Sequence, residues 1–447
     1  MRDELFYKYD VPAPRYTSYP TVPYWEDSPT TEEWVDSLNR GFSANPPWAC
    51  YVHIPFCETL CTYCGCNTSI TRNHDREMPY IELLLKEMKA YQERIQGIDA
   101  SPLQELHLGG GTPTFLSPKN LAYLVSSIMK GKTIAENFLG SIEVDPRRTT
   151  TEHLQVLRDL GFSRVSLGVQ DFDAEVQRLV HRIQPFEMTK SMTEVARDMG
   201  YSSVNFDLIY GLPTQTEESI LSMMEKTWLI KPDRIALYSL AIVPWIKPAQ
   251  KLFKDEDLPR GKEKRRLYEI ARQFLIDKGY IEIGMDHFAL PTDTLAISDQ
   301  QGELHRNFMG YVEHRTQILL GLGVSAISET PDCFHQNEKA LPVYERRVAK
   351  GEIPTLRGHK LTVEDQVRRE QILQFMTKGE TRLEDEKQAL KVKEFLSEMI
   401  DDQLVEVESG LLKLTKKGKP FLRNACMALD ERLLRNKPNS EVFSKSL

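Results

Sequence analysis

The sequence predicts an α/β fold: an open, partial (β/α)6 barrel, preceded by an N-terminal arm and followed by a mainly helical, winged-helix-like C-terminal domain. Three observations support this prediction. From about residue 48, short apolar segments alternate with helical patterns, as in a parallel sheet whose crossovers are helices. Clusters of unusual polar residues follow these apolar segments. Beyond residue 355 the alternation stops, and two helical patterns precede a hairpin.

Six short segments have the composition of buried strands. They span residues 48–54, 103–108, 141–145, 164–168, 204–209 and 234–239. All but the last are followed by a helical segment, such as residues 80–95, where apolar side chains recur at three- and four-residue spacing. Consecutive parallel strands joined by helices take right-handed crossovers. Because a closed barrel of this kind needs eight units, six units predict an open one.

Four consecutive segments are expected along the chain. Residues 1–44, rich in Tyr, Pro and Trp and without a clear period, form an arm; residues 45–290 form the barrel; residues 291–355 extend and connect it; residues 356–447 form a helical, lid-like domain. In this last segment, helices from residue 361 and over 385–399 precede a hairpin that turns at Ser409-Gly410, and a final helix begins near Lys417. A winged helix can bind DNA, but a lid over the barrel mouth is the favoured interpretation in so acidic a chain.

Composition excludes several classes of protein. With 447 residues, of which 40% are hydrophobic, the chain is long enough for two to three domains. The net charge of −8 argues against general nucleic-acid binding. No apolar run approaches the ~18 residues that span a bilayer, and the first residues lack the apolar stretch of a secretory signal. Seven cysteines are a sparse and odd number, so we expect reduced thiols and a cytoplasmic protein.

Cys57, Cys61 and Cys64 are the most informative residues of the chain. Their C-x3-C-x2-C spacing places three thiolates around one face of a four-iron cluster and leaves one iron without a protein ligand, unlike the fully ligated clusters of bacterial ferredoxins. The spacing resembles the signature of radical S-adenosylmethionine (SAM) enzymes, in which SAM chelates the open iron. A zinc site, with Cys66 as fourth ligand, is disfavoured because zinc knuckles usually come as two separated pairs. A disulfide is less compatible still, and the other three cysteines are interpreted as packed thiols.

The polar clusters all follow predicted strands. They comprise the cysteines, then Gly109-Gly110-Gly111-Thr112, Glu143 with Asp145, Gln170-Asp171, and Asp207 with Tyr210. Because strand C-termini meet at one face of a parallel barrel, we expect these residues at one mouth. Singly, a glycine run can be a tight turn and a carboxylate a helix cap. Together, Glu143, Gln170 and Asp207 offer acceptors for ribose hydroxyls.

The chain resembles the oxygen-independent coproporphyrinogen III oxidases (dehydrogenases), radical SAM enzymes of haem biosynthesis, almost from end to end. The resemblance rests on ten motifs: PRYTSYPT (14–21), YVHIPFC (51–57), CGC (64–66), GGGTPT (109–114), IEVDPR (142–147), GVQDF (168–172), DLIYGLP (207–213), GMDHFA (284–289), LHRNF (304–308) and GVSAIS (323–328). The cysteine motif alone indicates only the superfamily. The arm motif and the fourth cysteine of CGC are far more specific.

The resemblance implies a [4Fe-4S] cluster held by Cys57, Cys61 and Cys64, and two molecules of SAM. The first SAM would be held by Tyr51, Gly110, Glu143 and Ile327. The second would be held by Tyr63, Gly111, Thr112, Gln170, Arg182, Asp207 and Ala241. Cys66 and Tyr51 are the expected catalytic residues, and Cys66 is not expected to ligate the cluster. Two departures concern the second SAM: the family often has Phe at position 63, and residues 240–245 lack a histidine often found there.

The implied reaction converts two propionates of coproporphyrinogen III to vinyl groups, giving protoporphyrinogen IX, through a SAM-derived 5′-deoxyadenosyl radical. Unactivated C–H bonds require such a radical, so the cofactor carries the hard step. Arg15 and Arg306 are candidate carboxylate forks, although unpaired surface arginines are commoner. We expect a monomer served by a separate electron donor and acceptor. The alternatives are a radical SAM enzyme acting on haem and a haem chaperone, but such chaperones typically lack the CGC and arm motifs.

Overall fold

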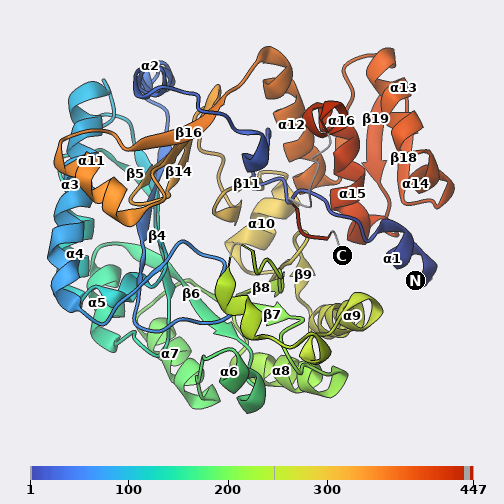
Figure 1. Ribbon diagram of the computed structural model, residues 1–447, viewed down its shortest axis with the longest axis horizontal. Coiled ribbons are helices and arrows are strands. Elements are labelled where there is room, and N and C mark those ends of the chain that lie inside the picture. Colours follow the sequence, from blue (N-terminus) through green and yellow to red (C-terminus); the bar gives the residue numbers. More distant parts are fainter. Residues whose placement is uncertain (1–2, 246, 437–442, 446–447) are drawn as a thin grey trace. The chain divides into compact units, whose positions relative to one another are not determined.

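The computed structural model describes residues 3–245, 247–436 and 443–445 (Figure 1). The chain divides into two compact units that are each built from separated segments. The larger unit contains residues 26–258 and 316–360, and the smaller unit contains residues 1–25, 259–315 and 361–447. These units differ from the four consecutive segments expected from the sequence, because segments far apart along the chain pack together.

A long sheet forms the centre of the larger unit. Its strands pair in the order β16-β15-β14-β13-β1-β4-β5-β6-β7-β8. Their bounds are β1 Trp48–Ile54, β4 Leu103–Gly110, β5 Ile134–Val144, β6 Phe162–Gln170, β7 Ser203–Tyr210, β8 Arg234–Ser239, β13 Ile318–Leu322, β14 Ile327–Glu329, β15 Cys333–Asn337 and β16 Thr355–Lys360. All neighbours from β13 to β8 are parallel. The open, six-unit barrel predicted from the sequence is confirmed, with β1 and β4–β8 as its strands.

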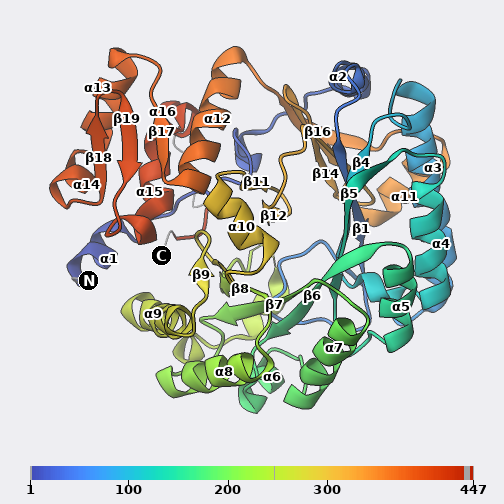
Figure 2. The same ribbon diagram turned by 180° about the vertical axis from the view of Figure 1, so that it is seen from behind.

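Helices join the parallel strands and form an outer layer. Those that pack on one another in sequence are α11 Leu341–Ala349, α3 Glu77–Arg94, α4 Pro118–Met129, α5 Thr151–Asp159, α7 Phe186–Asp198 and α8 Glu217–Ile230. Figure 2 shows α3, α4, α5 and α7 along the outside of the strands. Covered strands are buried on both faces, and β1 is accordingly buried at six of its seven residues. The loops after the strands therefore meet at one end of the sheet.

Strands β13 to β16, which lie on the side of β1 away from β4, were not predicted from the sequence. Ile318–Leu322 is a run of five buried residues that pairs parallel to β1, and β14 to β16 continue the sheet antiparallel. Single-sequence patterns do not separate such short apolar runs from buried turns of helix. Helix α2, Thr31–Phe42, was also missed, although Thr30 and Glu33 form a capping box that is visible in the sequence.

The smaller unit combines helices with a three-stranded sheet. Its helices are α1 Asp3–Tyr9, α9 Gly261–Asp277, α10 Thr294–Gln301, α12 Val363–Lys378, α13 Glu386–Phe395, α14 Ser397–Asp401, α15 Leu422–Cys426 and α16 Glu431–Arg435. The sheet has the order β17-β19-β18, formed by Glu380–Arg382, Leu411–Leu414 and Val405–Glu408. Two short antiparallel pairs precede it: β9 Ile281–Glu282 with β10 His287–Ala289, and β11 His305–Asn307 with β12 Gly310–Val312. Helix α12, helix α13 and the β18–β19 hairpin give the winged-helix-like arrangement expected from the sequence.

The N-terminal arm is part of the smaller unit's core. Tyr16 and Tyr19 are only 4% and 2% exposed, and they pack in one cluster with Phe375 and Phe421. The arm is also fixed through its backbone, because the Arg423 guanidinium donates hydrogen bonds to the carbonyls of residues 13 and 14. Residues 3–25 are thus ordered by burial, as expected for an arm without a regular period.

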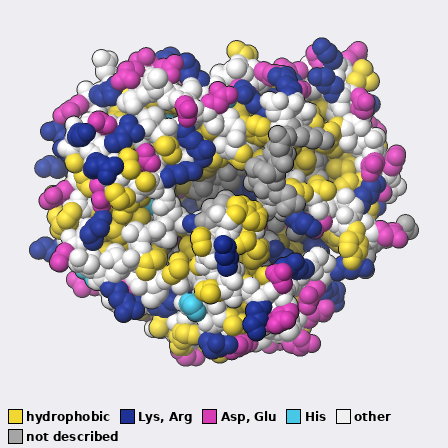
Figure 3. Space-filling model, viewed as in Figure 1, with side chains coloured by type: hydrophobic (Ala, Val, Ile, Leu, Met, Phe, Trp, Pro, Cys, Tyr) yellow, Lys and Arg dark blue, Asp and Glu magenta, His cyan; other side chains and the backbone are white. Residues whose placement is uncertain are grey.

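No helix within the described ranges is both long and apolar enough to cross a membrane. Acidic and basic side chains are interspersed over the face in Figure 3.

A buried carboxylic acid connects α3 to the far strands of the larger unit. Glu87 is fully buried, and its oxygens accept hydrogen bonds from the Gly323 N–H at 2.9 Å, the Asn337 amide at 2.6 Å and the Tyr344 hydroxyl at 2.6 Å. Burial raises the pKa of Glu87 to about 7 from an ordinary value of 4.5, although these donors oppose the shift. The folded protein consequently binds a proton that the unfolded chain releases between these two pH values.

We therefore expect Glu87 to make stability fall as pH rises from about 4.5 to about 7, by a total of about 3 kcal/mol. This stabilisation is fully present below about pH 4.5 and is lost above about pH 7, where the carboxyl group is charged in both the folded and the unfolded state. Glu87→Gln cannot titrate, so the difference in unfolding free energy between wild type and variant should change across this window. Urea denaturation of the metal-free proteins at pH 5, 6, 7 and 8 measures this difference. A difference independent of pH would contradict the assignment.

Candidate active site

The cysteine loop lies between β1 and α3, at the carboxyl end of β1. It is closed at its base by the short parallel pair β2 Phe56–Cys57 and β3 Ser69–Ile70. The Thr71 N–H donates to the Cys57 carbonyl at 2.9 Å, and the Cys64 N–H donates to the Cys61 carbonyl at 3.1 Å. The backbone thus holds the three cysteines on one short, ordered loop.

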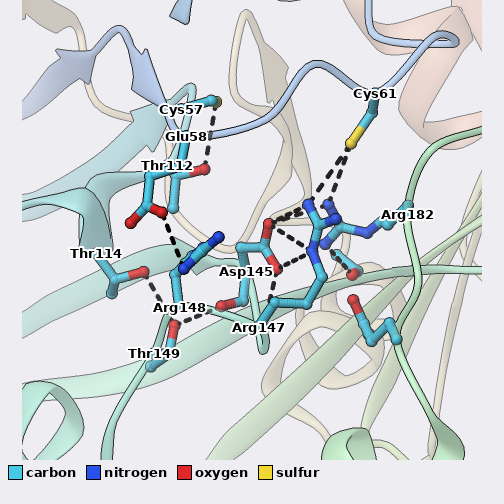
Figure 4. A network of polar contacts seen from close by, with 12 residues as sticks. Cys57, Glu58, Cys61, Thr112, Thr114, Asp145, Arg147, Arg148, Thr149 and Arg182 are labelled. Carbon is cyan, nitrogen blue, oxygen red and sulfur yellow. Dashed lines mark hydrogen bonds and ion pairs between the residues drawn. The ribbon is translucent and has the colours of Figure 1, made fainter. Parts of the chain in front are cut away.

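Two arginines approach Cys61 (Figure 4). The Arg147 Nη2 and Arg182 Nη1 atoms lie 3.6 and 3.7 Å from Cys61 Sγ. Both guanidinium groups are placed to donate a hydrogen bond to this sulfur. Cys57 Sγ lies 3.3 Å from the Thr112 hydroxyl, on the loop after β4.

Asp145, just after β5, fixes both arginines. Its carboxylate accepts hydrogen bonds from Arg147 Nη2 at 2.7 Å and from Arg182 Nη1 at 3.2 Å (Figure 4). Burial would raise the pKa of Asp145, but the two guanidinium groups lower it below its usual value. Arg182 also donates to the Gly168 carbonyl at 2.6 Å. Two fixed positive charges and one negative charge therefore lie beside Cys61.

Cys66 is exposed and lies next to Cys64. A hydrogen bond from the Cys66 thiol lowers the pKa of Cys64 to about 6, and the same contact raises the pKa of Cys66. Lys247 donates to the Cys66 carbonyl at 2.6 Å and so connects the cysteine loop to the segment after β8.

The cysteine loop fits an iron–sulfur cluster by its donor chemistry. Three thiol groups share one ordered loop, and the guanidinium groups of Arg147 and Arg182 lie beside Cys61. Within the described residues, no three His, Cys, Asp or Glu side chains converge closely enough for a single metal ion. In a four-iron cluster each thiolate binds a different iron, so the sulfurs have to surround a volume rather than meet at a point.

Glu143, at the end of β5, forms a second part of the site. Its carboxylate accepts hydrogen bonds from the Gly110 N–H at 3.1 Å and from His107 Nε2 at 3.5 Å. Partial burial acts to raise the pKa of Glu143, but these donors lower it below its usual value. The carboxylate is held charged at the mouth. The Tyr51 ring stacks on His107 with centroids 5.8 Å apart, and the Tyr51 hydroxyl lies 3.0 Å from His53 Nδ1.

The glycine run after β4 allows the close approach of two backbone segments. Gly110 has a φ of +115°, and a Cβ there would lie 2.8 Å from the His53 ring. A Cβ on Gly111 would lie 2.7 Å from the Pro55 carbonyl oxygen. Only glycine suits these positions, which lie beside the start of the cysteine loop.

A third group of predicted residues follows β6 and β7. Gln170, with a φ of 68°, and Arg182 both lie beside Gly168, where a Cβ would approach their side-chain nitrogens to 2.9 and 3.0 Å. On the neighbouring strand, Asp207 accepts hydrogen bonds from the Ser166 hydroxyl at 2.9 Å and the Asn205 amide at 3.0 Å. Oriented carboxylate and amide groups of this kind bind hydroxyls.

Gln250 joins two further predicted residues. Its side-chain nitrogen donates to the Ala241 carbonyl at 2.9 Å and to the Tyr63 carbonyl at 3.4 Å, and Gln250 is only 3% exposed. Ile327 begins β14, and its carbonyl lies against Gly321, the neighbour of Tyr51 in the sheet. Every predicted cluster and SAM residue therefore lies in the larger unit.

Arg15 and Arg306, predicted to bind the substrate, lie in the smaller unit. The Arg15 guanidinium pairs with Asp286, and Arg306 Nη2 donates to the Arg15 carbonyl at 3.4 Å. The structure brings these two residues together, although they are far apart in the sequence.

Sequence reasoning did not single out His53, His107, Arg147 or Gln250 as site residues. His53 lies two residues after Tyr51 on β1, so both side chains share one face of the sheet, and His107 is the residue of β4 that pairs with Tyr51. Arg147 is within the motif at residues 142–147, beside Asp145. Gln250 follows a segment without regular structure, and no local pattern indicates its contacts.

Comparisons with known proteins agree with this geometry. Residues 51–227 match the family model of the radical SAM superfamily. The chain is 38% identical to the oxygen-independent coproporphyrinogen III oxidase of Escherichia coli (strain K12), covering 99% of this chain and 97% of the relative. It is 37% identical to the oxidase of the same name from Helicobacter pylori (strain J99), covering 99% of both chains. A solved structure of the coproporphyrinogen III oxidase HemN from Escherichia coli, a radical SAM enzyme, superposes with a TM-score of 0.89 at 37% identity, covering 94% of this chain and 98% of the other.

Proposed function

This chain belongs to the family of oxygen-independent coproporphyrinogen III oxidases, and we infer that it converts coproporphyrinogen III to protoporphyrinogen IX in haem biosynthesis. It is a radical SAM oxidoreductase whose cofactors are a [4Fe-4S] cluster and SAM. Near-complete coverage of relatives at 37% to 38% identity is the observation that carries this conclusion. Fold alone would not, because one fold serves many chemistries.

Each of the two propionates loses CO2, one hydrogen atom and one electron to become a vinyl group. The cluster and SAM together supply a carbon radical able to remove the hydrogen atom, which no acid or base of the protein can do. The chain's own residues hold these groups, keep their charges compensated and present the substrate.

We assign the cluster to Cys57, Cys61 and Cys64. The proposal is supported by their shared loop and by the guanidinium groups of Arg147 and Arg182 beside Cys61. A cluster with three thiolate ligands is negatively charged at its protein side, so these two cations favour its binding.

We assign the first SAM to Tyr51, Gly110, Glu143 and Ile327. Glu143 supports this role best, because its carboxylate is kept charged and would attract the ammonium group of SAM. We assign a second SAM to the other predicted positions, which are Tyr63, Gly111, Thr112, Gln170, Arg182, Asp207 and Ala241. The grouping of Gln170 with Arg182, and the oriented Asp207 carboxylate on the next strand, support this second assignment.

We propose Cys66 and Tyr51 as the catalytic residues. Cys66 is exposed beside Cys64 without belonging to the three-cysteine motif, and the Tyr51 hydroxyl is oriented by His53. The proposal extends to a monomer that works in the cytoplasm with a separate electron donor and acceptor. All seven cysteines are free thiols, which suits a reducing compartment.

The activity is tested by anaerobic incubation of the reconstituted protein with coproporphyrinogen III, SAM and a reductant. We expect protoporphyrin after oxidation of the product, with two CO2 released per macrocycle. The matched reaction without SAM should give none. Cleavage of SAM with no vinyl product would contradict the proposed function.

A further inference from the structure

Three motifs of the sequence take no part in the cluster and SAM sites. They occupy residues 14–21, 284–289 and 304–308, and all three lie in the smaller unit. The structure joins one residue from each of them in a single group: Arg15 from the first, Asp286 from the second and Arg306 from the third. These three residues are far apart in the sequence, and the fold brings them into contact. We therefore asked what a group of charges at this position could bind.

Asp286 orients two neighbours. One carboxylate oxygen pairs with Arg15 Nη2, and the other lies 2.6 Å from His287 Nδ1. Burial would raise the pKa of Asp286, but the adjacent Arg15, His287 and Arg306 hold it far below its usual range. The carboxylate is therefore charged at neutral pH and fixes the position of Arg15.

Arg306 is a buried cation with unused donors. It is only 6% exposed, and its guanidinium carbon lies 4.4 Å from the centre of the Tyr311 ring. Nη2 donates to the Arg15 carbonyl, but Nε and Nη1 are buried without a hydrogen-bond partner. Leaving such donors unsatisfied is costly for a charged group. Among the described residues, Arg306 is the arginine with two such nitrogens.

A purely structural arginine in the same unit looks different. Arg423 also fixes the arm, and all of its nitrogens donate: Nε to the Pro14 carbonyl at 3.1 Å, Nη1 to the Lys445 carbonyl at 2.9 Å, and Nη2 to the Ala13 carbonyl. The arm is thus already held by a saturated arginine. Arg306 makes one contact of 3.4 Å to the arm, and this contact leaves its Nε and Nη1 without an acceptor.

Among the three side chains Arg15, Asp286 and Arg306, positive charge is in excess. Arg15 and Arg306 carry two positive charges, and Asp286 carries one negative charge. A bound anion would accept hydrogen bonds from the two unpartnered nitrogens of Arg306, Nε and Nη1. The Arg15 side chain is 37% exposed, so the group can be reached from solvent.

We propose that Arg306 and Arg15 form a carboxylate subsite that binds one propionate of the macrocycle, with Asp286 as the residue that positions Arg15. The inference rests on the proposed function, whose substrate carries four carboxylates. Guanidinium groups bind carboxylates with paired, charge-assisted hydrogen bonds. The Tyr311 ring covers one face of Arg306 and limits its orientation.

The test uses coproporphyrin III, a stable oxidised form of the substrate that keeps all four carboxylates, and its tetramethyl ester, which has none. Binding to the full-length, cluster-loaded protein is followed by absorbance titration. We expect Arg306→Gln to weaken binding of coproporphyrin III by at least about tenfold and Arg306→Lys to restore part of the loss. Binding of the ester, the Kd for SAM and the iron content should stay unchanged.

Asp286→Asn and Arg315→Gln complete the set. Asp286→Asn removes the charge that fixes Arg15 and should also weaken coproporphyrin III binding. Arg315 lies in the same unit and pairs with Glu370 at the surface, so Arg315→Gln should bind like wild type. If Arg306→Gln does not fold, Arg15→Gln replaces it with the same expected loss.

Each outcome is decisive. Equal binding of coproporphyrin III by wild type and Arg306→Gln would overturn this subsite while leaving the proposed function intact. Equal weakening for the free acid and the ester would also overturn it, because loss of shape rather than loss of a carboxylate contact would then be the cause. Failure of wild type both to bind coproporphyrin III and to form the vinyl product would overturn the proposed function itself, and this inference with it.

Discussion

Replacing any one of Cys57, Cys61 or Cys64 with Ala is expected to abolish the iron–sulfur absorbance and reduce decarboxylation to background. With three thiolates for four irons, the site has no spare ligand. Cys66→Ala should retain most of the iron but lose turnover, because Cys66 is proposed as a catalytic residue and not as a ligand of the cluster. Iron content, visible absorbance and protoporphyrin formation distinguish these results.

Cys50→Ala is the matched control for the cysteine variants. Cys50 is a fully buried thiol in β1, just ahead of the loop, so it reports the effect of losing a packed sulfur alone. We expect it to keep both iron and activity. Equal loss of iron from Cys66→Ala and from the three motif variants would contradict the proposed division of roles.

Glu143→Ala is expected to weaken SAM binding by about 10- to 100-fold, the size of a lost hydrogen bond to a charged group. The carboxylate is held by Gly110 and His107 at the mouth, so its removal should leave the sheet and the cluster in place. Equilibrium dialysis with SAM measures the affinity, and iron content confirms the cluster. Glu143→Gln should lose nearly as much, because the charge is removed although the shape is retained.

Glu136→Ala provides a control on the same strand. Glu136 is exposed near the beginning of β5, far along the strand from the mouth, and no role in cofactor binding is proposed for it. Its variant should bind SAM as wild type does. A Glu143→Ala protein that binds and cleaves SAM normally would remove Glu143 from the cofactor site.

The barrel and its mouth could be predicted from the sequence because their signals are local. Each barrel strand is a short apolar run, and the residue that follows it lies at the mouth whatever the rest of the chain does. Glu143 and Asp207 could therefore be placed on one face before any contact was known. The cysteine loop was equally local, since its three thiols lie within eight residues.

The remaining features depend on contacts between distant segments. Strands β13 to β16 join the sheet through pairing with β1, which no local pattern reveals. The links from Gln250 to Tyr63 and from Asp286 to Arg15 are equally long-range. Arg15 and Arg306 were predicted to bind the substrate because it is a polyanion, but only the fold shows that they share one group. The strand positions of His53 and His107 were visible, yet their contacts to Tyr51 and Glu143 require the registers of β1, β4 and β5.

The composition of the smaller unit has a consequence for the order in which the newly made protein folds. Its arm is synthesised first, but Tyr16 and Tyr19 are buried against residues of the last segment, such as Phe375 and Phe421. The arm therefore cannot bury its aromatic side chains against these residues until the barrel, which comes between them in the sequence, has been synthesised. Late closure of long-range contacts slows folding and exposes apolar surface to aggregation. The newly made chain thus passes through a stage in which Tyr16 and Tyr19 have been synthesised but the residues that bury them have not.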